Sequence, residues 1–453
     1  MSIRRTVLMQ AGAMAAIILI PAIGSAQQSS APKLPKAANG ARPTTFAGMP
    51  IAKAEEAGMD SARLQRIRDA VQRHIDAGNI SGAVVAVERK GKTVYLGAIG
   101  LMDVESKKPE ATDAIFRIFS MSKPITSVAV LTMLEEGRLR LSDPVSRFIP
   151  EFKSMKVAVP KPAAPGEAPA VGAGRGGRGG RGPAVEYDLV PASREITIQD
   201  LMTHTSGVGS GGGGRGPARA PEENLAAYIP KLGGAPLSFQ PGTRWAYSAA
   251  AGPDILGRIV EIVSGQPYDV FLRNRLFEPL GMKDTAFYAS PTDPRLHTSY
   301  QSSGGKLTKN MNQEAGTGKV YFSGAFGLVS TAEDYLRFAA MLANGGVLNG
   351  HRILAPRTIA LMGSNYVGDL FSLGRPGSNG QGFGLLVETV ENTAVSGRNL
   401  SPGSFGWDGA QGTRVWVDPK ENLAFVLLVQ TSYNASVLLH RDVETAIAQA
   451  IIK

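Results

Sequence analysis

The sequence predicts an α+β fold in which one antiparallel sheet is built from both ends of the chain and flanked by helices, with a mostly helical region inserted. Strand patterns occur near residues 83–96 and again over 383–429, the sequence between them is mostly helical in pattern, and apolar residues recur at helical spacing near both ends. A chain of 453 residues with 43% hydrophobic content is long enough to bury such a core.

The first residues have the pattern of an export signal. Arg4 and Arg5 precede an apolar run (residues 7–23) and a small-residue cleavage site (residues 24–26). We therefore expect residues 1–26 to be a signal peptide, and the mature protein to be periplasmic or secreted. The paired arginines also match part of the twin-arginine signal.

The folded domain is expected to span residues 51–453, after a flexible leader at 27–50 that is rich in Ser, Ala, Pro and Lys. Asp60 can cap a first helix that ends at Gly78. The apolar face of this helix consists of Leu64, Ile67, Val71 and Ile75. A hairpin with strands at 83–87 and 93–96 follows it.

A long apolar helix is expected directly after Lys123. Pro124 is acceptable in a first turn, the residues that follow are mostly apolar, and Gly137 ends the segment. Because this helix is apolar nearly all round, it should be buried. A further helix is expected over about 250–263.

The C-terminal part carries the remaining sheet strands. Their patterns cover residues 383–390, 413–417 and 423–429. A last helix is expected from about Arg441, with apolar residues at helical spacing, namely Val443, Ile447 and Ile451.

Two segments interrupt this plan. Residues 157–183 are rich in Pro, Ala and Gly-Arg-Gly repeats, and residues 208–220 are nearly all Gly, Arg, Pro and Ala. Neither buries enough apolar surface to offset the entropy of ordering, so both are expected to be disordered loops. Five arginines lie in them, so the net charge of +10 belongs largely to loops. No nucleic-acid partner is therefore expected.

Ser120 and Lys123 form a Ser-x-x-Lys motif where the buried helix begins. One helical turn brings both side chains onto the same face, where a desolvated lysine can take the proton of the serine hydroxyl. The helix N-terminus also favours developing negative charge. The same spacing recurs at Ser30 and Ser303. A capping serine beside a solvated lysine is therefore the alternative interpretation.

Five motifs in the same order resemble those of a known family, the class C serine β-lactamases with the family VIII carboxylesterases and D-alanyl-D-alanine peptidases. The resemblance runs from about Asp60 to the C-terminus and implies a β-lactamase-like fold. The motifs are Ser-x-x-Lys at 120–123, Leu-Met-Thr-His-Thr-Ser-Gly at 201–207, Pro-Gly-Thr-Arg-Trp-Ala-Tyr-Ser at 241–248, Ser-Gly-Ala-Phe-Gly-Leu-Val-Ser at 323–330 and Gly-Trp-Asp-Gly at 406–409.

The resemblance also implies a catalytic role for Tyr247, which matches the tyrosine that faces the nucleophile in the family. A phenol beside a lysine ammonium is more easily ionised, so Tyr247 and Lys123 would share one proton, deprotonate Ser120 and then protonate the leaving group. The backbone N–H groups of Ser120 and Ala410 would form the oxyanion hole. Ordinary core packing is the alternative role for Tyr247.

Residues 406–410 stand where β-lactamases carry Lys-Thr-Gly on an edge strand. Trp407 fits the Trp-x-Gly variant of family VIII esterases, and Gly409 would let the substrate approach the backbone. Asp408 is unusual and would either be a solvated strand residue or repel anionic substrates. Ala249 replaces an asparagine that helps to hold β-lactam side chains. We therefore expect a substrate-binding strand, formed by Trp407, Asp408 and Gly409, that favours esters.

Other kinds of site are not indicated. His204 lies in a structural turn of the family, and the chain has no Gly-x-Ser-x-Gly elbow. The histidines are scattered without His-Glu-x-x-His, so no metal or cofactor is expected. Without cysteine there is no disulfide or thiolate site. No later stretch is apolar enough to predict stable membrane insertion of the mature chain.

These features predict an exported serine hydrolase, specifically a carboxylesterase that cleaves a small-molecule ester through an acyl-Ser120 intermediate. A weak class C-like β-lactamase or a D-Ala-D-Ala peptidase would use the same residues on a β-lactam-like substrate. A non-catalytic muropeptide-binding protein is a further alternative, which the intact Ser, Lys and Tyr set disfavours.

Overall fold

The computed structural model describes residues 44–161, 186–210, 216–313, 318 and 320–453, all of which fall in one structural unit. The predicted signal peptide at 1–26 and most of the expected leader lie outside these residues and stay predictions.

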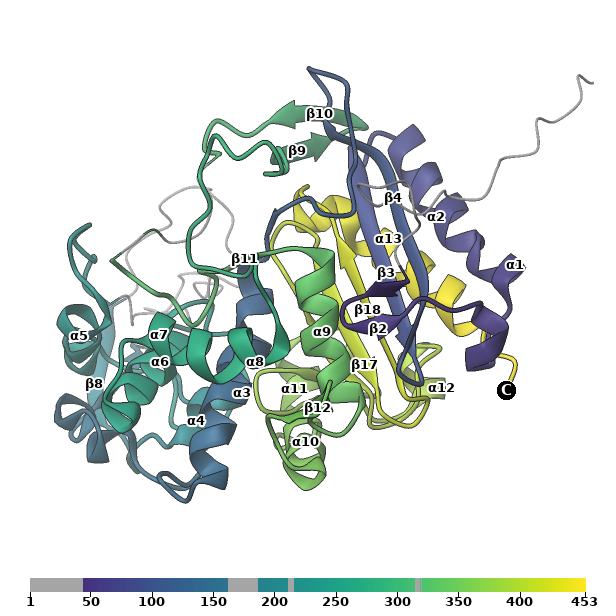
Figure 1. The fold of residues 1–453 in the computed structure, drawn as a ribbon. Helices are drawn as coiled ribbons and strands as arrows, with labels where there is room; N and C mark the ends of the chain where they lie inside the picture. The colour runs from purple at the N-terminus through teal and green to yellow at the C-terminus, as the bar shows by residue number, and fades with distance from the viewer. Residues whose placement is uncertain (1–43, 162–185, 211–215, 314–317, 319) are drawn as a thin grey trace, which may run out of the picture. The chain divides into compact units, whose positions relative to one another are not determined.

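One eight-stranded antiparallel sheet is built from both ends of the chain (Figure 1). β3 pairs with β18 through Val85 and Leu427, which joins the N-terminal and C-terminal strands as predicted. In sheet order the strands are β14 (Gln381–Phe383), β15 (Glu388–Val390), β16 (Phe405–Asp408), β17 (Arg414–Asp418), β18 (Leu423–Leu428), β3 (Gly82–Arg89), β4 (Lys92–Asp103) and β5 (Lys108–Pro109).

Helices cover both faces of this sheet (Figure 1). On one face lie α1 (Ser61–Leu64), α2 (Arg66–Asp76) and α13 (Tyr433–Ala448), which bury their apolar side chains with Val85 and Val87 of β3. On the other face α9 (Ala332–Ala343) packs against β3, β17 and β18. Asp60 caps α1 as predicted, because its carboxylate accepts the Arg63 N–H at 2.8 Å.

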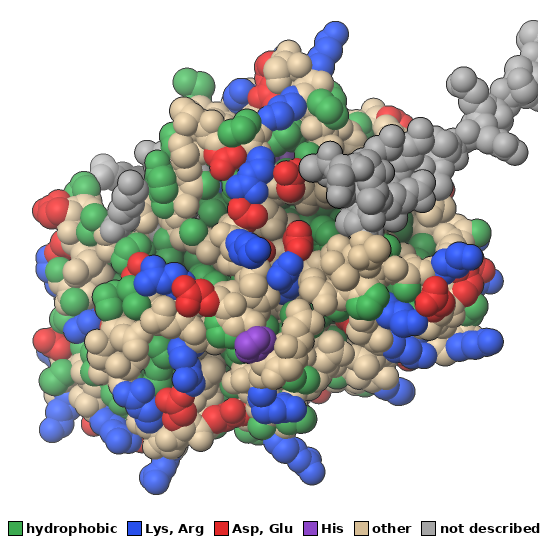
Figure 2. Space-filling view, viewed as in Figure 1, with side chains coloured by type: hydrophobic (Ala, Val, Ile, Leu, Met, Phe, Trp, Pro, Cys, Tyr) green, Lys and Arg blue, Asp and Glu red, His purple; other side chains and the backbone are tan. Residues whose placement is uncertain are grey.

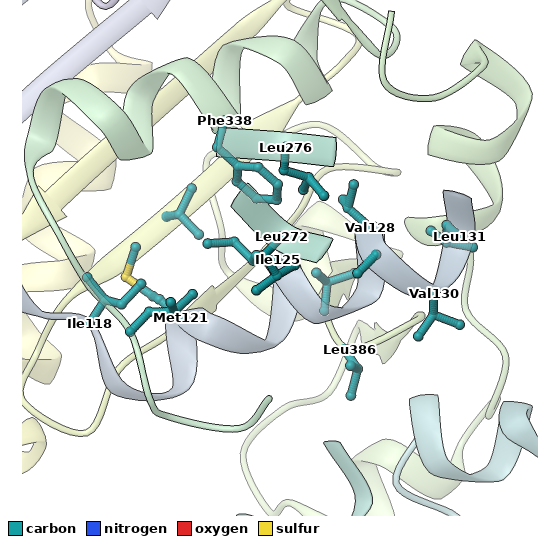
Figure 3. Close-up of a cluster of buried hydrophobic side chains, with 14 of the residues drawn as sticks. Ile118, Met121, Ile125, Val128, Val130, Leu131, Leu272, Leu276, Phe338 and Leu386 are labelled. Atoms are coloured by element: carbon teal, nitrogen blue, oxygen red, sulfur yellow. The ribbon is translucent and has the colours of Figure 1, made fainter. Parts of the chain in front are cut away.

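The helix predicted after Lys123 is α3 (Ser122–Glu135), and every side chain from Ser122 to Met133 is buried. Figure 3 shows why: Ile125 and Val128 lie among Leu272, Leu276 and Phe338, which come from other helices. The helix that carries the Ser-x-x-Lys motif is thus fixed on all sides by the core.

The inserted region is mostly helical, as predicted. Its helices are α4 (Ile198–Met202), α5 (Leu225–Tyr228), α6 (Ala251–Ser264), α7 (Tyr268–Leu272), η6 (Arg273–Phe277), α8 (Glu278–Leu280), α10 (Pro356–Met362) and α11 (Leu370–Gly374). Short 3₁₀ turns in the same region are η3 (Val145–Arg147), η4 (Pro150–Phe152) and η5 (Ile229–Gly234). Outside this region, η1 (Ala54–Ala57) precedes α1, and α12 (Thr393–Ser396) connects β15 with β16.

Short two-stranded ribbons complete the described structure. They pair β1 (Thr45–Phe46) with β2 (Met49–Pro50), β6 (Phe116–Arg117) with β11 (Val329–Ser330), β7 (Lys156–Pro160) with β8 (Tyr187–Pro191), β9 (Tyr300–Ser303) with β10 (Lys306–Lys309), and β12 (Val347–Leu348) with β13 (His351–Arg352).

Three of the segments expected to be irregular are partly ordered. In the expected leader 27–50, β1 and β2 form a hairpin whose Phe46 and Met49 are buried in the main core. In the expected loop 157–183, Val157 is buried in β7. In the segment 208–220, Val208 is buried as well. Composition alone does not distinguish these buried apolar residues from their neighbours. Residues 162–183 and 211–215 lie outside the described residues.

Two C-terminal predictions were wrong in their bounds. Residues 383–390 do not form one strand. Phe383 ends β14, residues 388–390 form β15, and the residues between them make a turn that pairs Phe383 with Glu388. The last helix begins at Tyr433, not near Arg441. Its first two turns show no regular apolar stripe, because Val437 and Leu438 are exposed while Ser436 is buried.

Charges are interspersed on the surface. On the face seen in Figure 2, basic and acidic side chains alternate without separating into fields of one sign. Among the described residues, no helix is both long enough and apolar enough to cross a membrane.

Candidate active site

Ser120 lies in η2 (Phe119–Met121), the single 3₁₀ turn that leads from β6 into α3. Phe119, just before it, has a left-handed φ of 45°, which is costly for a residue with a Cβ. The turn is held on its far side, where the Tyr335 hydroxyl donates to the Met121 carbonyl at 2.5 Å. This geometry leaves Ser120 half-buried at the start of a buried helix.

The Lys123 ammonium group is fully buried beside Ser120. Its Nζ lies 3.1 Å from Ser120 Oγ and 2.9 Å from the carbonyl oxygens of Ala249 and Ala325. A neutral amine has two hydrogens and one lone pair. As an ammonium, Lys123 donates to all three oxygens, Ser120 Oγ included. Once one proton is lost, with both remaining hydrogens on the carbonyls, the lone pair would face Ser120 Oγ, which is the arrangement that a general base needs.

The Tyr247 hydroxyl reaches the same atom, because it donates to Ser120 Oγ at 2.8 Å. Lys123 Nζ lies 5.0 Å from the centre of the Tyr247 ring. Among the described residues no hydrogen bond joins the two side chains directly, so any proton passed between Lys123 and Tyr247 would go through Ser120 Oγ. The structure thus brings the three predicted catalytic residues together.

The Gly409–Ala410 turn follows β16, a strand that packs against the 3₁₀ turn that carries Ser120. In the described part of the chain, the N–H groups of Ser120 and Ala410 have no hydrogen-bond acceptor, so both are free to donate to a substrate oxygen. Gly409 is required by the protein's own backbone: a Cβ there would lie 2.5 Å from the Ile118 carbonyl oxygen and closer still to Thr413 Oγ1. This is a second reason for glycine at this position; close approach of the substrate stays a prediction.

Comparisons with known proteins agree with this geometry. Residues 67–449 match the family model described as Beta-lactamase. The chain belongs to the beta-lactamase family. With its fold and its esterase relatives, it is a serine hydrolase of this family.

Individual relatives span most of the chain. Protein Rv1367c of Mycobacterium tuberculosis is 35% identical over 378 residues, which cover 80% of this chain and 88% of that protein. Esterase EstB of Burkholderia gladioli is 30% identical over 414 residues, covering 85% and 94%. The solved structure of EstCE1, "a hydrolase with promiscuous acyltransferase activity", superposes with a TM-score of 0.68 at 27% identity, covering 86% of this chain and 99% of that one.

In this member of the beta-lactamase family, Trp407 faces the site. It is 8% exposed, and its ring centre lies 5.6 Å from that of Tyr247 and 5.3 Å from that of Phe383. Its strand β16 is not an edge strand. However, β15 pairs with it only as far as Gly406, so the chain from Trp407 onward extends past β15.

Asp408 points to the opposite face, as alternation along a strand requires. Its carboxylate pairs with Arg414 at 2.6 Å and accepts the Tyr433 hydroxyl at 3.2 Å. Burial raises the pKa of Asp408, but the nearby charge of Arg414 and other cations outweighs burial and holds the pKa at about 2. Asp408 is thus neither a solvated strand residue nor a group that faces the substrate, and that prediction was wrong.

Asp408 ends a chain of six alternating charges behind the sheet. Each neighbouring pair is joined by an ion pair, and most members are buried, so the chain is internally neutral. In order, its members are Arg375, Glu388, Arg398, Glu444, Arg414 and Asp408.

Sequence reasoning missed Asp254, a buried carboxylate in α6. Asp254 accepts the hydroxyls of Tyr321 at 2.8 Å and Ser323 at 2.6 Å, and the N–H of Ala325 at 3.2 Å. It therefore holds the backbone of Ala325, the residue whose carbonyl accepts from Lys123. Burial raises the pKa of Asp254 to about 6, against the lowering effect of these hydrogen bonds and of Lys123. The available signal was an acidic residue beside apolar neighbours in the first turn of a largely buried helix.

His204 supports the site from outside it. Its ring packs edge-on against Tyr247 at 4.9 Å, and in the described structure no hydrogen bond links it to Ser120. Complete burial and the charge of Lys123 hold the pKa of His204 well below its usual range, so it is neutral. Its backbone has a left-handed φ of 57°, in keeping with a structural turn.

No group of three or more metal-ligating side chains occurs in the described ranges.

Proposed function

We propose that this chain is a carboxylesterase that cleaves small neutral esters through an acyl-Ser120 intermediate. The observation that carries the proposal is that Ser120 Oγ lies within hydrogen-bonding distance of both Lys123 Nζ and the Tyr247 hydroxyl. The names of EstB, an esterase, and EstCE1, a hydrolase, support the same reaction class.

In the proposed acylation step, Ser120 Oγ attacks the ester carbonyl carbon while its proton moves to Lys123. The carbonyl oxygen becomes an oxyanion, which accepts hydrogen bonds from the N–H groups of Ser120 and Ala410. Collapse of this tetrahedral species breaks the bond to the alkoxy oxygen. That oxygen takes up the proton held by the Lys123 and Tyr247 pair and leaves as the alcohol.

In the proposed deacylation step, water takes the place of the alcohol. The Lys123 and Tyr247 pair accepts one proton from water as its oxygen attacks the acyl carbon. The oxyanion hole again holds the negative charge, and the proton is returned to Ser120 Oγ as the carboxylic acid leaves.

We expect esters to be favoured over β-lactams because neither of the two side chains at the β-lactam-recognition positions is charged or carries an amide. Trp407 and Ala249 stand where β-lactamases place a cation and an amide, and Asp408 is neutralised by Arg414. A β-lactam carries a carboxylate, and the loss of one charge-assisted hydrogen bond costs about 1.5 to 3 kcal/mol, or roughly ten- to a hundredfold in kcat/KM. A neutral ester needs neither group.

The test compares p-nitrophenyl butyrate with nitrocefin on protein that begins near Gln27. We expect kcat/KM for the ester to be at least about tenfold higher. Ser120→Ala is the control: it should lose both hydrolysis and labelling by a fluorophosphonate while it keeps its melting temperature. A preference for nitrocefin would favour the β-lactamase alternative, and full labelling of Ser120→Ala would move the nucleophile elsewhere.

Export by residues 1–26 is a separate part of the proposal. It is supported by the charged, apolar and small-residue pattern of that segment. Expression of the full chain in a bacterium followed by N-terminal sequencing should give a mature end near Gln27, in the periplasm or the medium. An intact Met1 in the cytoplasmic fraction would contradict it.

A further inference from the structure

We propose that Tyr433 is a positioning residue for the oxyanion hole, holding the Gly409–Ala410 peptide from both sides. The inference rests on the proposed function, since it concerns the N–H of Ala410 as an oxyanion donor. Tyr433 is the first residue of α13 and is far from Ala410 in sequence, which is why no motif identifies it.

Tyr433 makes two hydrogen bonds that bracket the donor peptide. Its backbone N–H donates to the Ala410 carbonyl at 3.0 Å, after the peptide. Its hydroxyl donates to Asp408 Oδ2 at 3.2 Å, before the peptide. The Gly409–Ala410 peptide lies between these two fixed points, so one side chain and its own backbone set its location.

Asp408 is a rigid anchor for the hydroxyl. Its other carboxylate oxygen pairs with Arg414, which belongs to the neighbouring strand β17 and also pairs with Glu444 of α13. Because the carboxylate is ionised and held from two elements, the Tyr433 hydroxyl contacts a charge that cannot easily move.

The turn itself fixes the direction of the donor N–H. The Gly412 N–H donates to the Gly409 carbonyl at 3.0 Å, so the oxygen of the donor peptide is already hydrogen-bonded. Hydrogen bonding at the oxygen of a peptide polarises its N–H and strengthens it as a donor. His440, also on α13, donates from Nε2 to the Gly412 carbonyl at 2.8 Å. The start of α13 therefore holds the turn at Asp408, Ala410 and Gly412.

A donor that must contact an oxyanion only in the transition state is sensitive to small displacements. If the Asp408 contact is lost, the strand end before Gly409 loses its direct hydrogen bond to the first residue of α13 and keeps only the indirect link through Arg414 and Glu444, while the Ala410 contact remains. The N–H of Ala410 should then occupy a wider range of positions. Transition-state stabilisation should fall, whereas binding of the ground-state ester, which does not depend on this N–H, should not.

The test is Tyr433→Phe, which removes only the hydroxyl. The matched control is Tyr300→Phe, because the Tyr300 hydroxyl is also bonded to a carboxylate, that of Glu105 at 2.5 Å, and no contact links it to Ser120 or Ala410 in the described structure. For each protein, fluorophosphonate titration counts the active sites. We then measure kcat and KM for p-nitrophenyl butyrate, and the inhibition constant of phenylboronic acid. The boronic acid forms a tetrahedral adduct with the serine and so reports on the oxyanion hole.

We expect Tyr433→Phe to lower kcat per titrated site about tenfold and to weaken phenylboronic acid by a similar factor, with KM within about twofold. Tyr300→Phe should change none of these values. A merely structural role would reduce the number of titrated sites without changing kcat per site. Native values of kcat per site and of the boronic acid constant in Tyr433→Phe would overturn the inference.

Failure of the proposed function gives a different result. If the native protein does not hydrolyse the ester but is labelled by the fluorophosphonate, the ester assignment fails and the inference is tested by the labelling rate, which also requires the oxyanion hole. Equal labelling rates in native protein and Tyr433→Phe would then overturn the inference by itself. Absence of both labelling and boronic acid binding in the native protein would overturn both.

Discussion

Lys123 and Tyr247 both contact Ser120 Oγ, at 3.1 and 2.8 Å. We expect Lys123→Ala and Tyr247→Phe each to lower kcat for p-nitrophenyl butyrate about 100-fold or more, the usual scale for losing acid–base assistance. Because both side chains act on one atom, the double variant should be no slower than the slower single variant. Losses that multiply in the double variant would show that the two residues act independently.

The sequence could identify these three residues but not the groups that hold them. Ser120, Lys123 and Tyr247 belong to motifs with fixed spacing. The two lysine acceptors are backbone carbonyls, and a carbonyl has no residue type by which a sequence could reveal it. Asp254 and Tyr433 act through contacts between elements that are remote in the chain, so their roles appear only in three dimensions.

Glu88 is a buried carboxyl that lies outside the active site. It is fully buried on β3, its Oε1 accepts the Gly91 N–H at 2.7 Å, and its Oε2 has no partner among the described residues. Burial, only partly offset by hydrogen bonds from Gly91 and Ala424, raises the pKa of Glu88 from 4.5 to about 8.

This shift makes stability depend on pH. Since the folded-state pKa lies above the unfolded value, the folded protein keeps a proton that the unfolded chain releases. The contribution of Glu88 is therefore fully present below pH 4.5 and is lost as pH rises to about 8. Glu88→Gln removes this loss, so its stability relative to the native protein should be about 3 kcal/mol greater at pH 8 than at pH 5. Urea unfolding at both pH values measures this, and an equal difference at both would contradict it.

Among the elements, those with a repeating apolar pattern were predicted well and those defined by a partner were not. The helices α2 and α3 and the strands β3 and β18 follow from spacing and composition. The strands β1 and β7 are short, and what makes them strands is their pairing with β2 and β8. For β7 the pairing partner lies across a long insertion, and for β1 the two-residue strand is too short to show a pattern, so neither can be read from the local sequence.

The hairpin between β16 and β17 offers a test at this scale. Gly409→Ala should push the turn away from Ile118, because the added Cβ would lie 2.5 Å from the Ile118 carbonyl oxygen. Since the same movement carries the Ala410 N–H away from Ser120, kcat should fall about 100-fold or more. Gly234→Ala is the control, with no atom within 4 Å of its added Cβ. Native kcat in Gly409→Ala would contradict this reading of the turn.

For the whole molecule, the segment between β7 and β8 should be dispensable. The two strands are paired up to Pro160 and Tyr187, and the Lys161 N–H donates to the Glu186 carbonyl at 2.9 Å, so a short turn can join them. Replacing residues 163–183 by Asn-Gly should shift the melting temperature by only a few degrees, because loop closure entropy changes slowly with length. A fall of more than about 10 °C, measured by calorimetry, would show that the segment contributes buried contacts.

The pairing of β3 with β18 also orders events during synthesis. A ribosome releases β3, η2 and α3 early, but the strand that must lie beside β3 and the turn that carries Ala410 emerge only near the end of translation. Until then the central sheet has no middle strand, and the nucleophile has no second oxyanion donor. The nascent chain therefore cannot complete its native core or its proposed oxyanion hole until the last part of the chain has been made.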